Sequence, residues 1–136
     1  MRNIGIRRIG LTLGSLLVVV FALMFSGQLA LADGSGSMTG CMSECRSCQT
    51  SCEKVLAKEK DKNSDRAKLL GDCISMCKTS REFMSRGSAN HGKVCALCAD
   101  ICKKCAESCD TSKDKSTKDC AEECRKCASS CEKMAG

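Results

Sequence analysis

The chain has 136 residues, which is enough for one compact domain and too few for two separate cores. It has no Pro, Trp or Tyr and only three Phe, so an ordinary core would have few bulky side chains to fill it, whereas its fifteen Cys are typical of a disulfide scaffold or a metal protein. The formal net charge of +6 is small, and no Tyr or Trp can stack on bases, which argues against a nucleic-acid-binding protein.

Residues 1–32 have the pattern of an export signal peptide. Three Arg precede an apolar stretch over 9–25, and the small-x-small sequence at 30–32 offers a cleavage site. Arg7 and Arg8 resemble the start of a twin-arginine signal, although the residues after them match that signal poorly. Without cleavage, the apolar stretch is close to the ~20 residues of a membrane span, and only this segment would contact the membrane. We therefore expect an exported protein, periplasmic or extracellular.

The folded domain is expected to span residues 38–136, after a flexible Gly/Ser tether at 33–37. Its first predicted helix covers about residues 39–60 and carries four thiols in steps of four, three and four residues: Cys41, Cys45, Cys48 and Cys52. At about 100° per residue, these side chains lie within about 60° of one another around the helix. They therefore form one stripe.

The second predicted helix, about residues 64–86, has a thinner stripe with only two thiols, Cys73 and Cys77. The same helical period assigns the remaining inward positions to Arg66, Leu69, Ser80 and Met84. This helix therefore offers fewer thiols than the others.

The third and fourth predicted helices cover about residues 91–110 and 117–134. Their thiols again alternate in steps of three and four: Cys95, Cys98, Cys102, Cys105 and Cys109, then Cys120, Cys124, Cys127 and Cys131. Asn90 and Ser116 are suitable N-caps, the latter with Asp119 three residues later. Each of these helices is therefore expected to carry a full stripe.

Short polar connections at 58–63, 85–90 and 111–117 make successive helices antiparallel. The sequence thus predicts an all-α fold, an antiparallel four-helix bundle with a Cys-lined core. Taking each connection as a mirror point predicts which residues face one another. The predicted layers are Cys48, Cys77, Cys98 and Cys131; then Cys52, Cys73, Cys102 and Cys127; then Leu56, Leu69, Cys105 and Cys124.

Two interpretations of the buried thiols require no metal. Cys can act as a small apolar side chain, but thirteen or more at core positions would leave a bundle under-filled. Disulfides suit an exported protein, yet fifteen is an odd number, and Cys at i and i+4 of one helix have nearly parallel Cβ directions. Bridges between helices stay open, so the alternative to metal binding is a disulfide-stabilised helical structural protein without metal.

Metal binding explains the stripes more directly. Thiolates at i, i+3 and i+4 can hold one ion between two sulfurs and share sulfurs with the next ion. Each Zn²⁺ held by four thiolates leaves two negative charges, which is costly when repeated in a dry core, whereas one Cu(I) per thiolate is neutral. Soft thiolates also prefer Cu(I), and the loop typical of iron–sulfur proteins has no counterpart here. We therefore expect multiple Cu(I) ions per chain.

The Cys-x3-Cys and Cys-x2-Cys repeats over four helices, behind an export signal and with Met and His at one end, resemble the bacterial copper storage proteins. The resemblance covers about residues 38–134. It implies a core filled with Cu(I)–thiolate sites, with all fifteen Cys as ligands, and a homotetramer in the exported members. The departure from the family is the second helix, with only Cys73 and Cys77.

In an up-down-up-down bundle, the starts of helices one and three lie beside the finishes of helices two and four. This end carries five further predicted Cu(I) ligands: Met38, Met42, Met84, His91 and Met134. A thioether binds Cu(I) more weakly than a thiolate, so we expect copper to enter here. His91 has no paired carboxylate and no Cys pair has a thioredoxin-like βαβ context, so we expect a storage or sequestration protein of copper homeostasis, with no catalytic residue and no enzyme activity.

Overall fold

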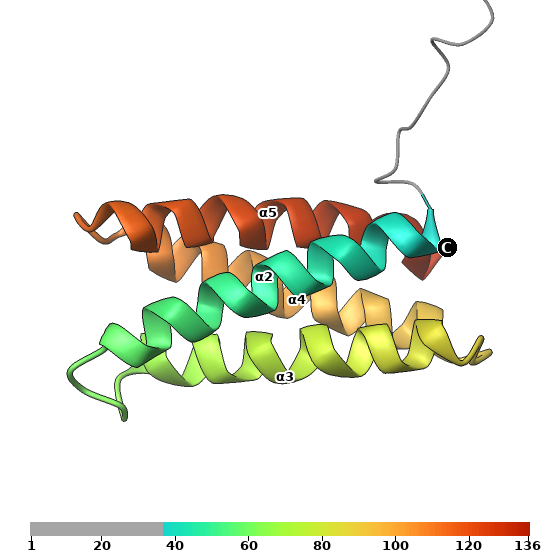
Figure 1. Ribbon diagram of the computed structural model, residues 1–136, viewed down its shortest axis with the longest axis horizontal. Helices are drawn as coiled ribbons and strands as arrows, with labels where there is room; N and C mark the ends of the chain where they lie inside the picture. The colour runs from blue at the N-terminus through green and yellow to red at the C-terminus, as the bar shows by residue number, and fades with distance from the viewer. Residues whose placement is uncertain (1–36) are drawn as a thin grey trace, which may run out of the picture. The chain divides into compact units, whose positions relative to one another are not determined.

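The computed structural model describes residues 37–136 and confirms the all-α, antiparallel four-helix bundle (Figure 1). The helices are α2 (Met38–Lys58), α3 (Asp65–Ser85), α4 (His91–Asp110) and α5 (Lys115–Ala135). Helix α2 packs against α3 and α5, and α4 packs against the same two helices, so the four form a closed ring around one core. The predicted signal peptide and residues 33–36 of the predicted tether lie outside the described residues.

The helix starts are set by side-chain caps. Ser37, the last residue of the predicted tether, is the N-cap of α2, and its hydroxyl accepts a hydrogen bond from the Gly40 N–H at 3.0 Å. The prediction that Ser116 caps the fourth helix is wrong, because Asp114 takes this role and accepts from the Thr117 N–H at 2.9 Å. Helix α5 therefore begins two residues earlier than expected. Asn90 occupies the N-cap position of α4 without a side-chain cap bond.

The helix finishes also differ slightly from the predicted bounds. Helix α2 ends at Lys58 rather than residue 60, and the Lys62 ammonium folds back and donates to the carbonyls of Leu56 and Ala57 in the last turn. At the end of α3, Gly87 adopts a φ of 61°, which a residue without Cβ tolerates. Ser88 N–H then donates to the Phe83 carbonyl at 3.0 Å, which closes the helix in a Schellman motif.

Thiols and small residues make up most of the core. All fifteen Cys side chains have no exposed surface, and the accompanying buried residues on α4 and α5 include Ala99, Ala106, Ala121 and Ala128. Such small side chains let two helices approach closely, and α4 and α5 share the most extensive contact in the bundle. Among the described residues no helix is long and apolar enough to cross a membrane.

Two inward positions predicted for α3 are wrong. Leu70 and Ala67 are buried, whereas Leu69 and Arg66 are only partly covered. Counting back from Cys73 in steps of three rather than four gives the observed positions, and both steps are compatible with a helix. Arg66 instead points outward, where its guanidinium forms an ion pair with Glu59 at 2.7 Å.

Candidate metal centre

Four helices contribute thiols to a single buried column. Helix α4 provides five of them, α2 and α5 four each and α3 two. The members are all the Cys residues of the chain: Cys41, Cys45, Cys48, Cys52, Cys73, Cys77, Cys95, Cys98, Cys102, Cys105, Cys109, Cys120, Cys124, Cys127 and Cys131, and each is a free thiol. The structure therefore brings together every Cys that the sequence analysis selected as a ligand.

Neighbouring sulfurs form an unbroken path through the core, which we call the sulfur path. Successive Sγ atoms along it lie 3.5 to 4.0 Å apart. In order, its members are Cys41, Cys131, Cys45, Cys127, Cys77, Cys102, Cys73, Cys48, Cys124, Cys52 and Cys120. Nearly every step crosses from one helix to another, so the path depends on the tertiary fold.

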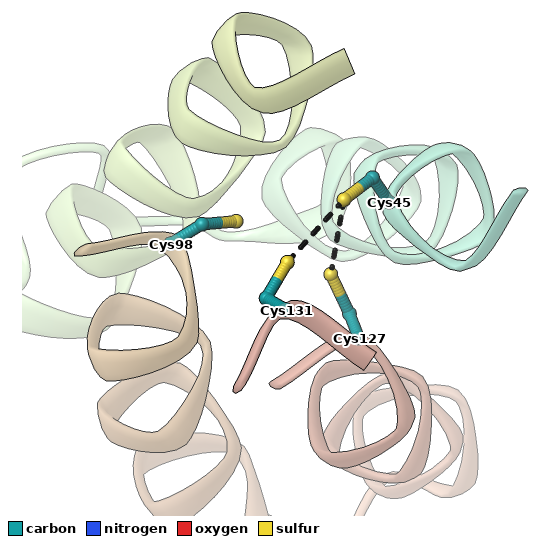
Figure 2. A group of neighbouring side chains, drawn as sticks. All are labelled: Cys45, Cys98, Cys127 and Cys131. Carbon is teal, nitrogen blue, oxygen red and sulfur yellow. Dashed lines mark hydrogen bonds between the residues drawn. The ribbon is translucent and has the colours of Figure 1, made fainter. Parts of the chain in front are cut away.

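Four sets of four sulfurs are compact enough to surround one ion, since all sulfurs in a set lie within 4.8 Å of one another. Group 1 is Cys45, Cys98, Cys127 and Cys131; group 2 is Cys77, Cys98, Cys102 and Cys127; group 3 is Cys48, Cys73, Cys77 and Cys102; group 4 is Cys48, Cys52, Cys73 and Cys124. Figure 2 shows group 1, in which α2, α4 and α5 direct their sulfurs into one space. A further set of three sulfurs comprises Cys41, Cys95 and Cys131.

The predicted layers are confirmed between α3 and α4 and between α4 and α5. Cys73 lies 3.5 Å from Cys102, Cys77 shares group 2 with Cys98, and Cys98 shares group 1 with Cys131. Between α3 and α5 the prediction is wrong, because Cys77 lies 3.8 Å from Cys127 rather than beside Cys131. Treating the connection as a mirror point works for α3 and α4 because a tight Schellman turn joins them. The chain therefore reverses about a well-defined centre.

The predicted position of α2 against α5 is wrong. Cys48 was expected to face Cys131, but Cys41 and Cys45 each lie 3.6 Å from Cys131, and Cys48 is 3.6 Å from Cys124. The displacement of α2 is already present against α3, because Cys48 lies 3.5 Å from Cys73, the expected partner of Cys52. The third predicted layer is also wrong in its α2 member. Val55 is buried, whereas Leu56, which was predicted to lie inside, is only partly covered.

Hydrogen bonds between the sulfurs divide the thiols by acidity. Donation by Cys127 and then Cys131 lowers the pKa of Cys45 to about 2, and donation by Cys102 holds the pKa of Cys73 far below its ordinary value. The pKa of Cys95, by contrast, is raised mainly by burial. A thiolate that accepts bonds from protonated neighbours is a prepared ligand, because only the thiolate form binds metal.

One end of the core, which we call the methionine end, is finished by Met38, Met42, Met84, His91 and Met134. Met84 is buried, and the other four are partly covered. The start of α2 and the finish of α5 meet here, where Cys41 and Cys131 are 3.6 Å apart. Gly92 lets α4 join them, since a Cβ at this position would lie 3.3 Å from the Ala135 carbonyl oxygen.

His91 is oriented by its own helix start. Its Nδ1 lies 2.8 Å from the Ser88 carbonyl oxygen, which can only accept, so Nδ1 carries the proton. The lone pair of Nε2 is therefore available to a metal ion, which is the arrangement that metal-binding His residues use. Binding of Cu(I) by this ring and by the four Met thioethers stays a prediction.

The opposite end, which we call the leucine end, is closed by Val55, Leu70, Ala67 and Thr117, all buried. The Lys58 ammonium donates to the Ser116 hydroxyl at 3.1 Å and joins α2 to α5 above this closure. Sequence reasoning missed the closure, because it placed Leu56 and Leu69 inside; the β-branched side chain of Val55 gave no signal that distinguished it from its neighbour.

Comparisons with known proteins agree on one family. The family model described as copper storage protein matches residues 30–136. A crystal structure of a protein from Nitrosospira multiformis is 35% identical, with a TM-score of 0.66 over 72% of this chain and 94% of that chain. The Cu(I)-bound copper storage protein BsCsp3 is 30% identical, with a TM-score of 0.67 over 71% of this chain and 95% of its own.

The apo form of copper storage protein 3 from Bacillus subtilis is also 30% identical, with a TM-score of 0.67 over 71% of this chain and 96% of that chain. Among curated proteins, none matches this chain. The similarity covers nearly the full length of these solved structures and corresponds to the bundle itself.

Proposed function

Because the chain belongs to the copper storage protein family, we propose that it stores several Cu(I) ions, bound by the thiolates that line its core. The observation that carries this function is the sulfur path, which joins thiols of all four helices at spacings of 3.5 to 4.0 Å. Soft sulfur ligands select Cu(I), and one ion per thiolate leaves the dry core without net charge.

The capacity is expected to approach one Cu(I) per thiol, on the order of fifteen per chain, because that ratio neutralises the buried sulfurs. A titration of the reduced domain against a competing Cu(I) chelator measures it. Saturation at one or two ions would contradict storage and indicate a single binding site instead.

The competing function is a disulfide-stabilised structural protein without metal. A count of free thiols in the protein purified without reductant separates the two. Many reactive thiols that disappear when Cu(I) is added support storage, whereas almost none before reduction supports the scaffold.

The role is that of a store without enzyme activity. His91, the single His of the chain, donates its Nδ1 proton to a backbone carbonyl, so no carboxylate orients it as a general base. The family relationship supports the same reading, because its members in the solved structures are described as storage proteins.

Export and assembly belong to this proposal too. The Arg-rich start, apolar stretch and small-x-small site within residues 1–32 support export to the periplasm or the cell exterior. Contact with the membrane is restricted to this segment when it is not cleaved. A homotetramer follows from the resemblance to exported family members, and light scattering of the purified domain measures it.

The methionine end is proposed as the entry port. Its five residues, Met38, Met42, Met84, His91 and Met134, offer ligands without a thiolate charge at the place where the sulfur path begins with Cys41. Weaker ligands at an entrance can pass ions inward rather than hold them.

A further inference from the structure

The sulfur spacings in the core match those of tetrahedral sites for divalent ions. A Zn²⁺ ion with four Zn–S bonds of about 2.3 Å separates its sulfurs by about 3.8 Å, from the geometry of a tetrahedron. The close sulfur pairs within groups 1 to 4 are 3.5 to 4.0 Å apart. No sulfur pair in any group exceeds 4.8 Å, so small side-chain movements suffice to enclose one ion.

Separate four-sulfur sites, in which each thiolate binds a single ion, cannot form at all four groups, because neighbouring groups share sulfurs. Groups 1 and 2 share Cys98 and Cys127, groups 2 and 3 share Cys77 and Cys102, and groups 3 and 4 share two more. Groups that are not neighbours in this order have no residue in common. At most two four-sulfur sites can therefore be occupied at once.

We propose that the copper-free bundle binds soft divalent ions such as Zn²⁺ and Cd²⁺, two per chain, each enclosed by four thiolates from the non-overlapping groups. One ion occupies group 1 or group 2, and the other occupies group 3 or group 4. This goes beyond Cu(I) storage, because it assigns a second class of metal and a different coordination number to the same thiols.

Net charge in the core makes the binding of divalent ions weaker than the binding of Cu(I). One divalent ion with four thiolates forms a complex with two negative charges, in a core whose described residues include no buried Lys or Arg. Cu(I) fills the same thiols without leaving net charge, and it binds thiolates more strongly than Zn²⁺ does. The divalent ions are therefore displaced when Cu(I) arrives, and they protect the reduced core until then.

Co²⁺ is a suitable probe, because tetrahedral cobalt with four thiolate ligands has intense visible absorption bands. The reduced, copper-free domain is titrated anaerobically with Co²⁺ alone, and Zn²⁺ is then added to bleach the bands. The starting protein carries Cys41→Ser, which removes the three-sulfur set and leaves groups 1 to 4 intact. Two equivalents of Co²⁺ should bind, and two equivalents of Zn²⁺ should displace them.

The overlap of the groups gives a pattern of counts that substitution can test. Cys127→Ser removes groups 1 and 2, and Cys73→Ser removes groups 3 and 4, so each should lower the count from two to one. The double variant should bind none. Cys109→Ser is the matched control, because Cys109 is equally buried but belongs to none of the groups, and it should still bind two.

Circular dichroism of each variant verifies that the bundle is folded. The inference is overturned if the starting protein shows no tetrahedral cobalt bands, or if Cys109→Ser loses as much cobalt as Cys73→Ser. A Cu(I) titration of the same samples keeps this failure distinct from failure of storage. A capacity near one Cu(I) per remaining thiol without cobalt binding refutes only the divalent sites, whereas loss of both refutes copper storage as well.

Discussion

The two ends of the bundle continue the same thiol stripes but finish them differently. At the methionine end, buried Met84 and partly covered His91 lie beside Cys41, the start of the sulfur path. At the leucine end, Leu70 and Val55 fill the same inward positions with branched aliphatic side chains. The comparison teaches that the thiols set what the core holds, whereas the proposed entry port rests on the different residues that follow the thiols at the two ends.

The largest expected effect is the gain in thermal stability when Cu(I) is loaded. Loading should also reduce the difference in stability between the two ends of the bundle. Filling one site at a thousandfold excess over its Kd contributes about 4 kcal/mol, and each kcal/mol raises the Tm of a domain of this size by about 4–8 °C. Loading with several Cu(I) ions should therefore raise the Tm by tens of degrees. Thermal melts followed by circular dichroism measure this.

Helical content should change little on loading, because the copper-free bundle is already folded. Amide hydrogen exchange should show the gain in protection to be greater at the methionine end, where unbranched Met side chains rather than Val55 and Leu70 cover the core. A coil-to-helix transition on loading would contradict this and indicate a metallothionein-like chain.

Leu70→Ala should open the closed end. Leu70 has no exposed surface, and truncation of such a side chain costs about 2–5 kcal/mol of the free energy of unfolding. Urea denaturation of the copper-free protein measures the loss. Cu(I) capacity should stay the same, since no ligand is removed; a proportional loss of capacity would show that the leucine end belongs to the storage region.

Replacing Met84, His91 and Met134 together by Leu should give the methionine end an aliphatic closure like that of the leucine end. Uptake from a chelator and removal by it should slow by on the order of tenfold, equivalent to about 1.4 kcal/mol on the barrier, while capacity stays nearly intact. Stopped-flow absorption of the Cu(I)–thiolate bands measures both rates.

Met76→Leu is the matched control for that variant, because Met76 is a partly buried residue in the middle of α3 and far from either end along the helix. It should leave the rates unchanged. Unchanged rates in the triple variant, or a loss of most of the capacity, would disprove the port.

The smallest effect concerns the cap of α5 at the leucine end. Hydrogen bonds from the Ser116 hydroxyl, the Thr117 N–H and the Thr117 hydroxyl lower the pKa of Asp114 to about 2. Since this pKa is below the ordinary 3.8, the ionised carboxylate stabilises the fold above that value, and its contribution is lost as the pH falls through about 2.

Asp114→Ala should therefore lower the Tm slightly at neutral pH, and the difference from the unsubstituted chain should vanish in strong acid. Asp114→Asn keeps a capping oxygen and should lose less than Asp114→Ala. Copper uptake rates should be unaffected by either change. A slower uptake would place an entrance at the leucine end and reverse the comparison.

Spacing along the chain was sufficient to predict the helices and the inward direction of every thiol. A Cys at three- or four-residue steps can only form a stripe on a helix, so Cys41 and Cys131 could be placed in the core without tertiary information. Copper followed from the charge of the thiolates, and the family comparisons confirm that prediction.

The relative height of α2 could not be predicted in the same way. Its displacement is already present across the first connection, where Cys48 lies 3.5 Å from Cys73, the expected partner of Cys52, and it also places Cys45 rather than Cys48 beside Cys131. The choice between Leu69 and Leu70 was equally hidden, because two leucines in succession satisfy the helical period equally well. Local periodicity determines which face of a helix is buried, whereas packing across the bundle determines how far the helix is shifted along its axis relative to its neighbours.

The proposed port at one end has a consequence for the order of uptake and release. If copper enters at the methionine end and Val55 and Leu70 close the other, the ion admitted first would come to rest deepest. The most recently stored copper would then leave first, and copper next to Cys120 would be retained longest.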